Sequence, residues 1–135
     1  LILQSCATYH AQYGKDIKNP VIEYDTNSSI AHTFFLVGDA GNANQEQTQK
    51  TLELLHIRLK NSDKKSTLLF LGDNIYPKGF PTDNSPEEIA LAETKLNNQL
   101  QLSKNFKGKT IFIPGNHDWQ NGITSLERQS KFVTN

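Results

Sequence analysis

The sequence predicts an α/β fold in which short parallel strands alternate with helices. Three apolar runs, at residues 33–37, 66–71 and 110–114, have the length and composition of buried strands. The segments between them carry apolar residues at helical spacing, so the predicted order is β-α-β-α-β with a further helix after it. Right-handed crossovers make the strands run parallel, with helices on both faces of the sheet.

The helices have recognisable boundaries. The first is expected from about residue 45 to residue 60. The second begins after Ser85, which has the type of an N-cap residue, and Pro86 occupies its first turn. A third is expected from Gly122 to Phe132. The apolar stripes of the first two helices consist of Leu52, Leu55 and Leu59 and of Ile89, Leu96 and Leu100.

Composition restricts the classes of protein to consider. The chain has 135 residues, of which 36% are hydrophobic, enough for the core of one domain. Lys and Arg total 14, as do Asp and Glu, and this balance argues against binding along a nucleic-acid backbone. No apolar run approaches the roughly 20 residues of a membrane span. Six lysines near element ends are interpreted as solvent-exposed: Lys60, Lys64, Lys65, Lys104, Lys107 and Lys109.

Each predicted strand ends in glycine and then an oxygen-bearing side chain. These side chains are Asp39, Asp73 and Asn116. Any one of them alone would be ordinary turn chemistry. Because the carboxyl ends of parallel strands lie along one edge, the three are expected to meet there, with the Asp39 and Asp73 carboxylates within about 6 Å of each other.

Two neighbouring carboxylates repel unless a positive charge lies between them. The three strand-end motifs contain no Lys or Arg, so a bound cation is the simplest way to keep Asp39 and Asp73 ionised. Tyr76 follows Asp73 by three residues. Carboxylate, amide and phenolate oxygens suit Mn, Fe(III), Mg or Zn, and a phenolate favours the ferric ion. A carboxylate that bridges two ions would form a two-metal clamp for phosphoryl chemistry.

At these residues the chain resembles a known family. Its strand-end segments are Gly38-Asp39-Ala40-Gly41, Gly72-Asp73-Asn74-Ile75-Tyr76 and Gly115-Asn116-His117-Asp118. They look like the first three motifs of the calcineurin-like metallophosphoesterases. Tyr76, together with Gly41 where most other branches carry histidine, matches the purple acid phosphatase branch.

The resemblance implies a fold and a site. The fold is the N-terminal half of a metallophosphoesterase-type layered α/β sandwich, with mainly parallel strands and helices packed on the sheet. The site holds Fe(III) on Asp39 and Tyr76, a divalent Fe, Zn or Mn ion on Asn116, and Asp73 as the bridge. The implied reaction is hydrolysis of a phosphate ester, monoester or diester, by a metal-bound hydroxide, with His117 contacting substrate or protonating the leaving oxygen.

The family pattern contains three further histidines, in later motifs that this sequence lacks. His32 lies before the first strand, roughly 20 Å from Asp39 at about 3.3 Å per residue, and His56 lies inside a helix. His10 belongs to the polar lead-in, residues 1–31. Residues 32–135 are therefore interpreted as the first part of a longer phosphoesterase domain, and this fragment is expected to be inactive alone.

Three residues beside the motifs have two interpretations each. Asp118 either orients His117 or caps a turn, and the first role is favoured. Asn42 either reaches substrate at the rim or forms a turn. Trp119 either lines the mouth of the site or packs against the domain.

The first residues indicate a cellular location. Residues 1–6 resemble the end of a bacterial lipoprotein signal, in which Cys6 would be lipidated. The alternative is a lone cysteine in a frayed terminus. A lipid anchor would place the protein outside the cytoplasm, in the periplasm or on the cell envelope. The second functional hypothesis is a non-catalytic envelope module that retains the phosphoesterase fold.

Overall fold

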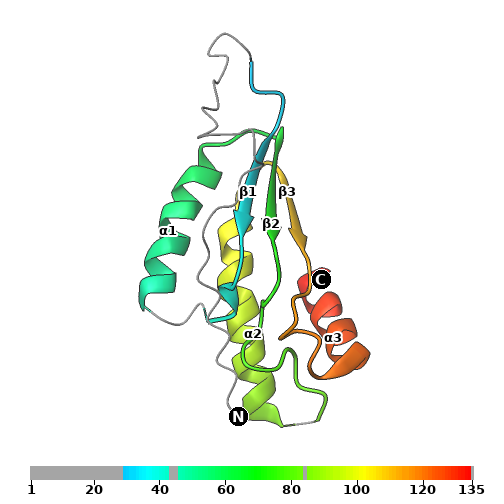
Figure 1. The fold of residues 1–135 in the computed structure, drawn as a ribbon. Helices are drawn as coiled ribbons and strands as arrows, with labels where there is room; N and C mark the ends of the chain where they lie inside the picture. The colour runs from blue at the N-terminus through cyan, green and yellow to red at the C-terminus, as the bar shows by residue number, and fades with distance from the viewer. Residues whose placement is uncertain (1–28, 43–45, 84, 135) are drawn as a thin grey trace, which may run out of the picture.

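The computed structural model describes residues 29–42, 46–83 and 85–134, drawn in colour in Figure 1. Its strands and helices are β1 (Thr33–Val37), α1 (Glu46–Lys60), β2 (Ser66–Phe70), α2 (Pro86–Leu100), β3 (Lys109–Phe112) and α3 (Gly122–Thr134). Two 3-10 turns, η1 (Ala40–Asn42) and η2 (Gln101–Ser103), follow β1 and α2. The predicted order is confirmed, although β3 ends two residues earlier than expected. Cys6 and His10 lie outside the described residues.

The three strands form one parallel sheet in the order β1-β2-β3. Val37 pairs with Phe70, and Phe70 pairs with Phe112, so the last residues of the strands are in register. The arrows in Figure 1 accordingly point the same way. The loops that follow the strands therefore leave the sheet at one edge, which confirms the predicted α/β class.

One face of the sheet carries the main core. Leu68 and Phe70 of β2 are buried there against Leu52 and Leu59 of α1 and Leu102 of η2. Figure 1 shows α1 and α2 standing beside this sheet. A second core cluster joins α2 to the loop after β2 through Ile75, Phe80, Ala92 and Leu96. The loop that carries Tyr76 is thus anchored to α2 by apolar packing.

The other face of the sheet differs from the prediction. Phe34 and Leu36 of β1 are each 62% exposed, and Ile111 of β3 is 44% exposed. The apolar runs were taken to be buried on both faces, but among the described residues no helix covers this side. The alternation of burial along β1 follows from this arrangement, because successive side chains point to opposite faces.

The α2 helix begins as predicted but buries an unexpected stripe. The Ser85 side chain accepts a hydrogen bond from the Glu88 backbone N–H at 3.5 Å. Buried positions on the helix include Lys95 and Gln99 beside Leu96. The six lysines expected to be solvent-exposed are exposed. Lys95 is a buried cation on a helix that packs against the Tyr76 loop.

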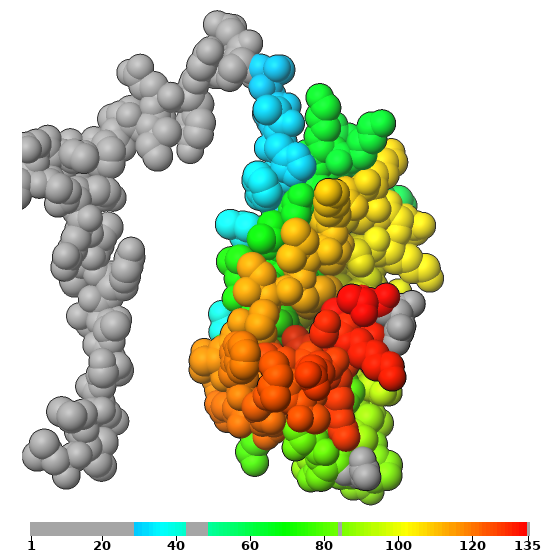
Figure 2. Space-filling model, turned by 90° about the vertical axis from the view of Figure 1, so that its right-hand side faces the viewer, coloured from blue at the N-terminus to red at the C-terminus, as the bar shows by residue number. Residues whose placement is uncertain are grey.

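Figure 2 turns the molecule to show α3, in orange and red, lying below β3. Gln129 and Ser125 are the buried residues of this helix. Across the part of the chain that the structure describes, no helix has the length and apolar character needed to cross a bilayer.

Candidate metal centre

Asp39 and Asp73 both occupy unusual backbone conformations where β1 and β2 end. Their φ angles are 57° and 53°, in the left-handed region that side chains other than Asn and Asp rarely adopt. The two loops are bonded to each other, since Gly41 N–H donates to the Asp73 carbonyl at 2.8 Å. Asp39 N–H likewise donates to the Gly72 carbonyl at 3.3 Å. This pairing holds the two acids at the same edge of the sheet.

A single phenolic oxygen connects the two carboxylates. Tyr76 Oη lies 2.6 Å from Asp39 Oδ1 and 2.9 Å from Asp73 Oδ2. A phenol has one proton to donate, so it cannot satisfy two ionised carboxylates at once. The structure therefore brings together three hard oxygen ligands around a point that is short of positive charge.

The pKa of Tyr76 reflects the same lack of positive charge near the three oxygens. Its hydrogen bond to Asp39 is the largest cause of a raised pKa for the phenol, followed by burial and the hydrogen bond to Asp73. Each carboxylate favours the protonated phenol over the phenolate. A bound cation would reverse this preference, because it stabilises all three negative oxygens together. The donor set accordingly fits a hard metal ion.

The third motif reaches Asp73 through its backbone. His117 N–H donates to Asp73 Oδ1 at 3.1 Å, and a side chain on Gly115 would collide with the same carboxylate. Asn116 stands between these two residues, so it lies at the same edge with an exposed side chain. Its role as a ligand stays a prediction. Among the described residues, no three His, Cys, Asp or Glu side chains form a metal-binding group. The oxygen cluster contains two such residues, Asp39 and Asp73, and its third oxygen belongs to Tyr76.

His117 presents a defined ring to this edge. Its Nδ1 lies 2.6 Å from the Pro77 carbonyl oxygen, and its ring lies 4.5 Å from the Tyr76 ring between centroids. Because a carbonyl oxygen only accepts hydrogen bonds, Nδ1 carries the proton in this contact. Nε2 is then the ring nitrogen left for a ligand, which suits the predicted contact with substrate.

Asp118 does not orient His117 in the structure. Its fully buried carboxylate accepts from the backbone N–H groups of Asn74, Ile75 and Gly115 at 3.1, 3.0 and 2.8 Å. It also accepts from the Asn74 side-chain amide at 3.0 Å. A carboxylate that receives several N–H donors can remain buried. Asp118 therefore joins the second motif to the third, in place of the role favoured from the sequence.

Residues 32–134 match the calcineurin-like phosphoesterase family. The chain belongs to this family. Neither the curated proteins nor the solved structures yielded a match to it. Membership establishes the general class, a metal-dependent phosphoesterase domain that acts on phosphate esters.

In this phosphoesterase, the packing around Gly41 explains why the position lacks a side chain. A Cβ there would stand 2.5 Å from the Asp73 carbonyl oxygen and 2.8 Å from the backbone nitrogens of Ile75 and Tyr76. A histidine at residue 41 would therefore displace the loop that carries Asp73 and Tyr76. The atoms that leave no room for a side chain at residue 41 all belong to the backbone of residues 73–76.

Gly41→Ala is expected to lower the free energy of unfolding by about 2 kcal/mol, since the methyl group overpacks a rigid backbone contact. Urea denaturation of the metal-free protein measures this. Gly38→Ala is the matched control, because a Cβ at Gly38 meets no atom within 4 Å. Equal stabilities of the two variants would show that the loop at residues 73–76 yields freely.

The remaining predicted residues lie as follows. His32 Nε2 is 2.9 Å from Thr67 Oγ1, at the start of the sheet, and His56 Nδ1 is 3.3 Å from the Leu102 carbonyl. Neither histidine joins the oxygen cluster, in agreement with the sequence argument. Asn42 is half-buried in η1, and Trp119 is 51% exposed next to the third motif. Their roles at a substrate rim stay predictions.

Sequence reasoning missed two residues of α2 that contact the second motif. Lys95 Nζ donates to the Tyr76 carbonyl at 2.6 Å, and Gln99 Nε2 donates to the Asn74 carbonyl at 2.8 Å. Burial lowers the pKa of the Lys95 ammonium. A signal was present, because both residues fall on the same helical face as Ala92 and Leu96. Polar residues inside an apolar stripe are the pattern to look for.

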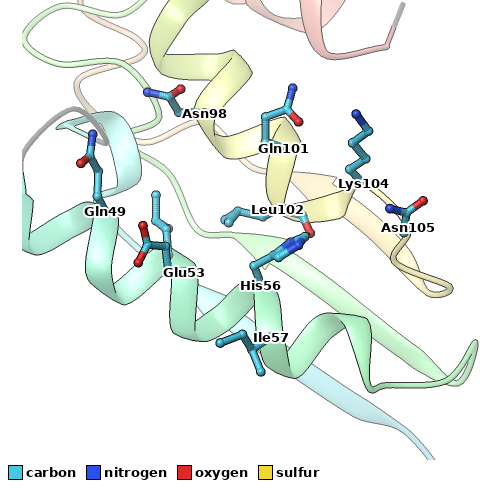
Figure 3. A pocket seen from close by; sticks show the side chains of 10 residues that line it. Gln49, Glu53, His56, Ile57, Asn98, Gln101, Leu102, Lys104 and Asn105 are labelled. Atoms are coloured by element: carbon cyan, nitrogen blue, oxygen red, sulfur yellow. The ribbon is translucent and has the colours of Figure 1, made fainter.

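A separate cavity of about 670 Å³ lies between α1 and the end of α2 (Figure 3). Glu53 and His56 of α1 and Asn98 and Gln101 on the other side are among its lining residues. None of the residues that line it belongs to the three motifs. It is therefore distinct from the candidate metal centre.

Proposed function

We propose that this chain is the N-terminal part of a purple acid phosphatase-like enzyme, which hydrolyses phosphate esters at a dinuclear metal site. The observation that carries the proposal is the Tyr76 phenol held between Asp39 and Asp73. An ordinary turn does not need a phenol at that point. A metal pair that uses phenolate and carboxylate oxygens does.

The two metal ions would have different ligands from this chain. Asp39 and Tyr76 would hold a ferric ion, Asp73 would bridge, and Asn116 would hold a divalent Fe, Zn or Mn ion. Bound there, the ions would supply a nucleophile derived from water and offset the charge of the phosphoryl group. The remaining ligands of the pair would come from the later histidine motifs that these 135 residues lack, which is why the 135-residue chain alone is expected to be inactive.

The chain's own residues would then orient the reaction. Tyr76 and Asp73 fix the position of the site through the second motif, while the His117 backbone amide holds the Asp73 carboxylate at 3.1 Å. The His117 ring is fixed through Nδ1 by the Pro77 carbonyl. With Nδ1–H held by that carbonyl, Nε2 would donate a proton to the leaving oxygen from the doubly protonated imidazolium form of the ring.

The protein is proposed to work outside the cytoplasm, anchored through a lipid on Cys6. The sequence of residues 1–6 supports this location. A non-catalytic envelope module remains the second candidate. The observation that favours it is the exposed apolar face at Phe34 and Leu36, which could serve as a surface for assembly with another protein.

The test is metal-dependent hydrolysis of p-nitrophenyl phosphate by the full-length protein. We expect activity after loading with iron and zinc or manganese, and loss of activity after removal of the metals by a chelator. The 135-residue chain under the same conditions is expected to show none. A full-length protein that binds metal at Asp73 without hydrolysing phosphate monoesters or diesters would favour the module.

Tyr76→Phe is expected to remove a visible absorption band from the ferric full-length protein. The band would arise from charge transfer between the phenolate and Fe(III), and phenylalanine retains the ring while removing the oxygen. The fold should survive, because Tyr76 is half-exposed. The absorption spectrum measures the band, with Tyr24→Phe as a control that lies outside the three motifs. A band that persists in Tyr76→Phe would exclude this phenolate as a ligand.

A further inference from the structure

Two buried side chains of α2 have no part in the metal-ligand set. Lys95 is 5% exposed and Gln99 is fully buried, although the helix stripe around them is otherwise apolar. Burying an ammonium group costs free energy unless its hydrogen bonds compensate. A leucine or methionine would fill the Lys95 position without that cost. The retained cation therefore needs a reason in what it contacts.

Both side chains contact the same short backbone segment. Lys95 Nζ donates to the Tyr76 carbonyl at 2.6 Å, and Gln99 Nε2 donates to the Asn74 carbonyl at 2.8 Å. These carbonyls flank Ile75, whose own side chain is buried against α2. One helix thus holds two carbonyl groups of the second motif, those of Asn74 and Tyr76.

The backbone N–H groups of this segment are bound by Asp118 of the third motif. Asp118 accepts from the backbone N–H groups of Asn74 and Ile75 at 3.1 and 3.0 Å. The carbonyls of Asn74 and Tyr76 are therefore held by α2, and the backbone N–H groups of Asn74 and Ile75 are held by Asp118 of the third motif. The phenol of Tyr76 is aimed at Asp39 and Asp73 by a backbone with little freedom to move.

We propose that Lys95 and Gln99 are positioning residues that hold the Tyr76 loop in the geometry that binds metal. This rests on the proposed function and adds to it a source of rigidity that lies outside the three motifs. A positively charged helix residue fixes a carbonyl more strongly than a neutral donor does. Loss of either contact allows Tyr76 to move away from the two carboxylates. Metal binding must then order the Tyr76 loop, and this ordering lowers the affinity for the ion.

The test compares Mn(II) affinity of full-length variants by electron paramagnetic resonance of the free ion. Lys95→Met and Gln99→Leu are each expected to weaken binding about tenfold, the size of effect seen when groups behind metal ligands are removed. Lys95→Arg keeps the positive charge and is expected to recover most of the affinity. Lys131→Met is the control, since Lys131 is exposed on α3.

A double-mutant cycle separates positioning from a general loss of stability. If Lys95 acts through Tyr76, adding Lys95→Met to Tyr76→Phe should weaken Mn(II) binding further by less than about twofold. A role in packing alone would give the full tenfold loss in both backgrounds, and that result would overturn the proposal. Unchanged affinity in Lys95→Met and Gln99→Leu would overturn it as well.

Amide hydrogen exchange in the metal-free protein tests the positioning role of Lys95 even if the proposed function fails. Failure of the function would appear as wild-type Mn(II) binding that Asp73→Asn leaves unchanged. Lys95→Met is expected to accelerate exchange at Asn74 and Ile75 about tenfold more than at Leu68 in the core of β2. Equal acceleration at all three amides, or none, would contradict the proposed positioning whatever the metal result.

Discussion

Asp118→Ala is expected to lower the free energy of unfolding by about 3 to 5 kcal/mol, because it leaves buried N–H groups without acceptors. The carboxylate is fully buried and serves Asn74, Ile75 and Gly115. This one side chain satisfies donors from two different loops. Urea denaturation of the metal-free protein measures the loss.

Asp63→Ala provides the comparison for this variant. Asp63 is exposed, and its carboxylate accepts from the Lys65 backbone N–H at 2.8 Å within a turn. Its removal is expected to cost less than about 1 kcal/mol. If Asp118→Ala lost no more stability than Asp63→Ala, the two motif loops would be held together by something other than this carboxylate.

Asp73→Asn is expected to reduce phosphate-ester hydrolysis by the full-length protein about 10³-fold or more. The proposed bridging carboxylate supplies the charge that keeps both ions in place, and losing it removes several kcal/mol of transition-state stabilisation. Asparagine has nearly the same shape and retains an oxygen for the His117 amide, so the fold should persist. Turnover of p-nitrophenyl phosphate at saturating metal measures the effect.

Asp63→Asn is the matched control for the charge change, because Asp63 lies before the start of β2 and Asp73 lies after its end. We expect its turnover to equal that of the wild type. Activity of Asp73→Asn within tenfold of the wild type would mean that Asp73 does not bridge the metal ions, and the assignment of the site would have to change.

Much of the fold was predictable because its signals are local. The strand Thr33–Val37 and the start of α2 at Pro86 follow from β-branched content and from the Ser85 cap. The meeting of Asp39 with Asp73 follows from the parallel topology, which delivers strand ends to one edge. These inferences require only the order of the strands and helices and the residue that follows the glycine at the end of each strand.

What the sequence did not predict depends on distant contacts. Asp118 is close to His117 in sequence, yet its partners Asn74 and Ile75 lie more than forty residues away along the chain. Likewise, nothing local to Lys95 indicates the Tyr76 carbonyl as its partner. The exposure of Phe34 was missed because an apolar run shows that both faces can be buried, without showing that both are.

Anomalous diffraction from crystals of the full-length protein grown with Mn(II) tests whether Asp39, Asp73 and Tyr76 form a metal centre. We expect an anomalous peak about 2.0 to 2.3 Å from oxygens of all three side chains, at the distances typical of hard metal ligands. We also expect the peak to be lost in Asp73→Asn crystals. Ordered manganese bound elsewhere, with Tyr76 still hydrogen-bonded to both carboxylates, would contradict this assignment of the metal centre.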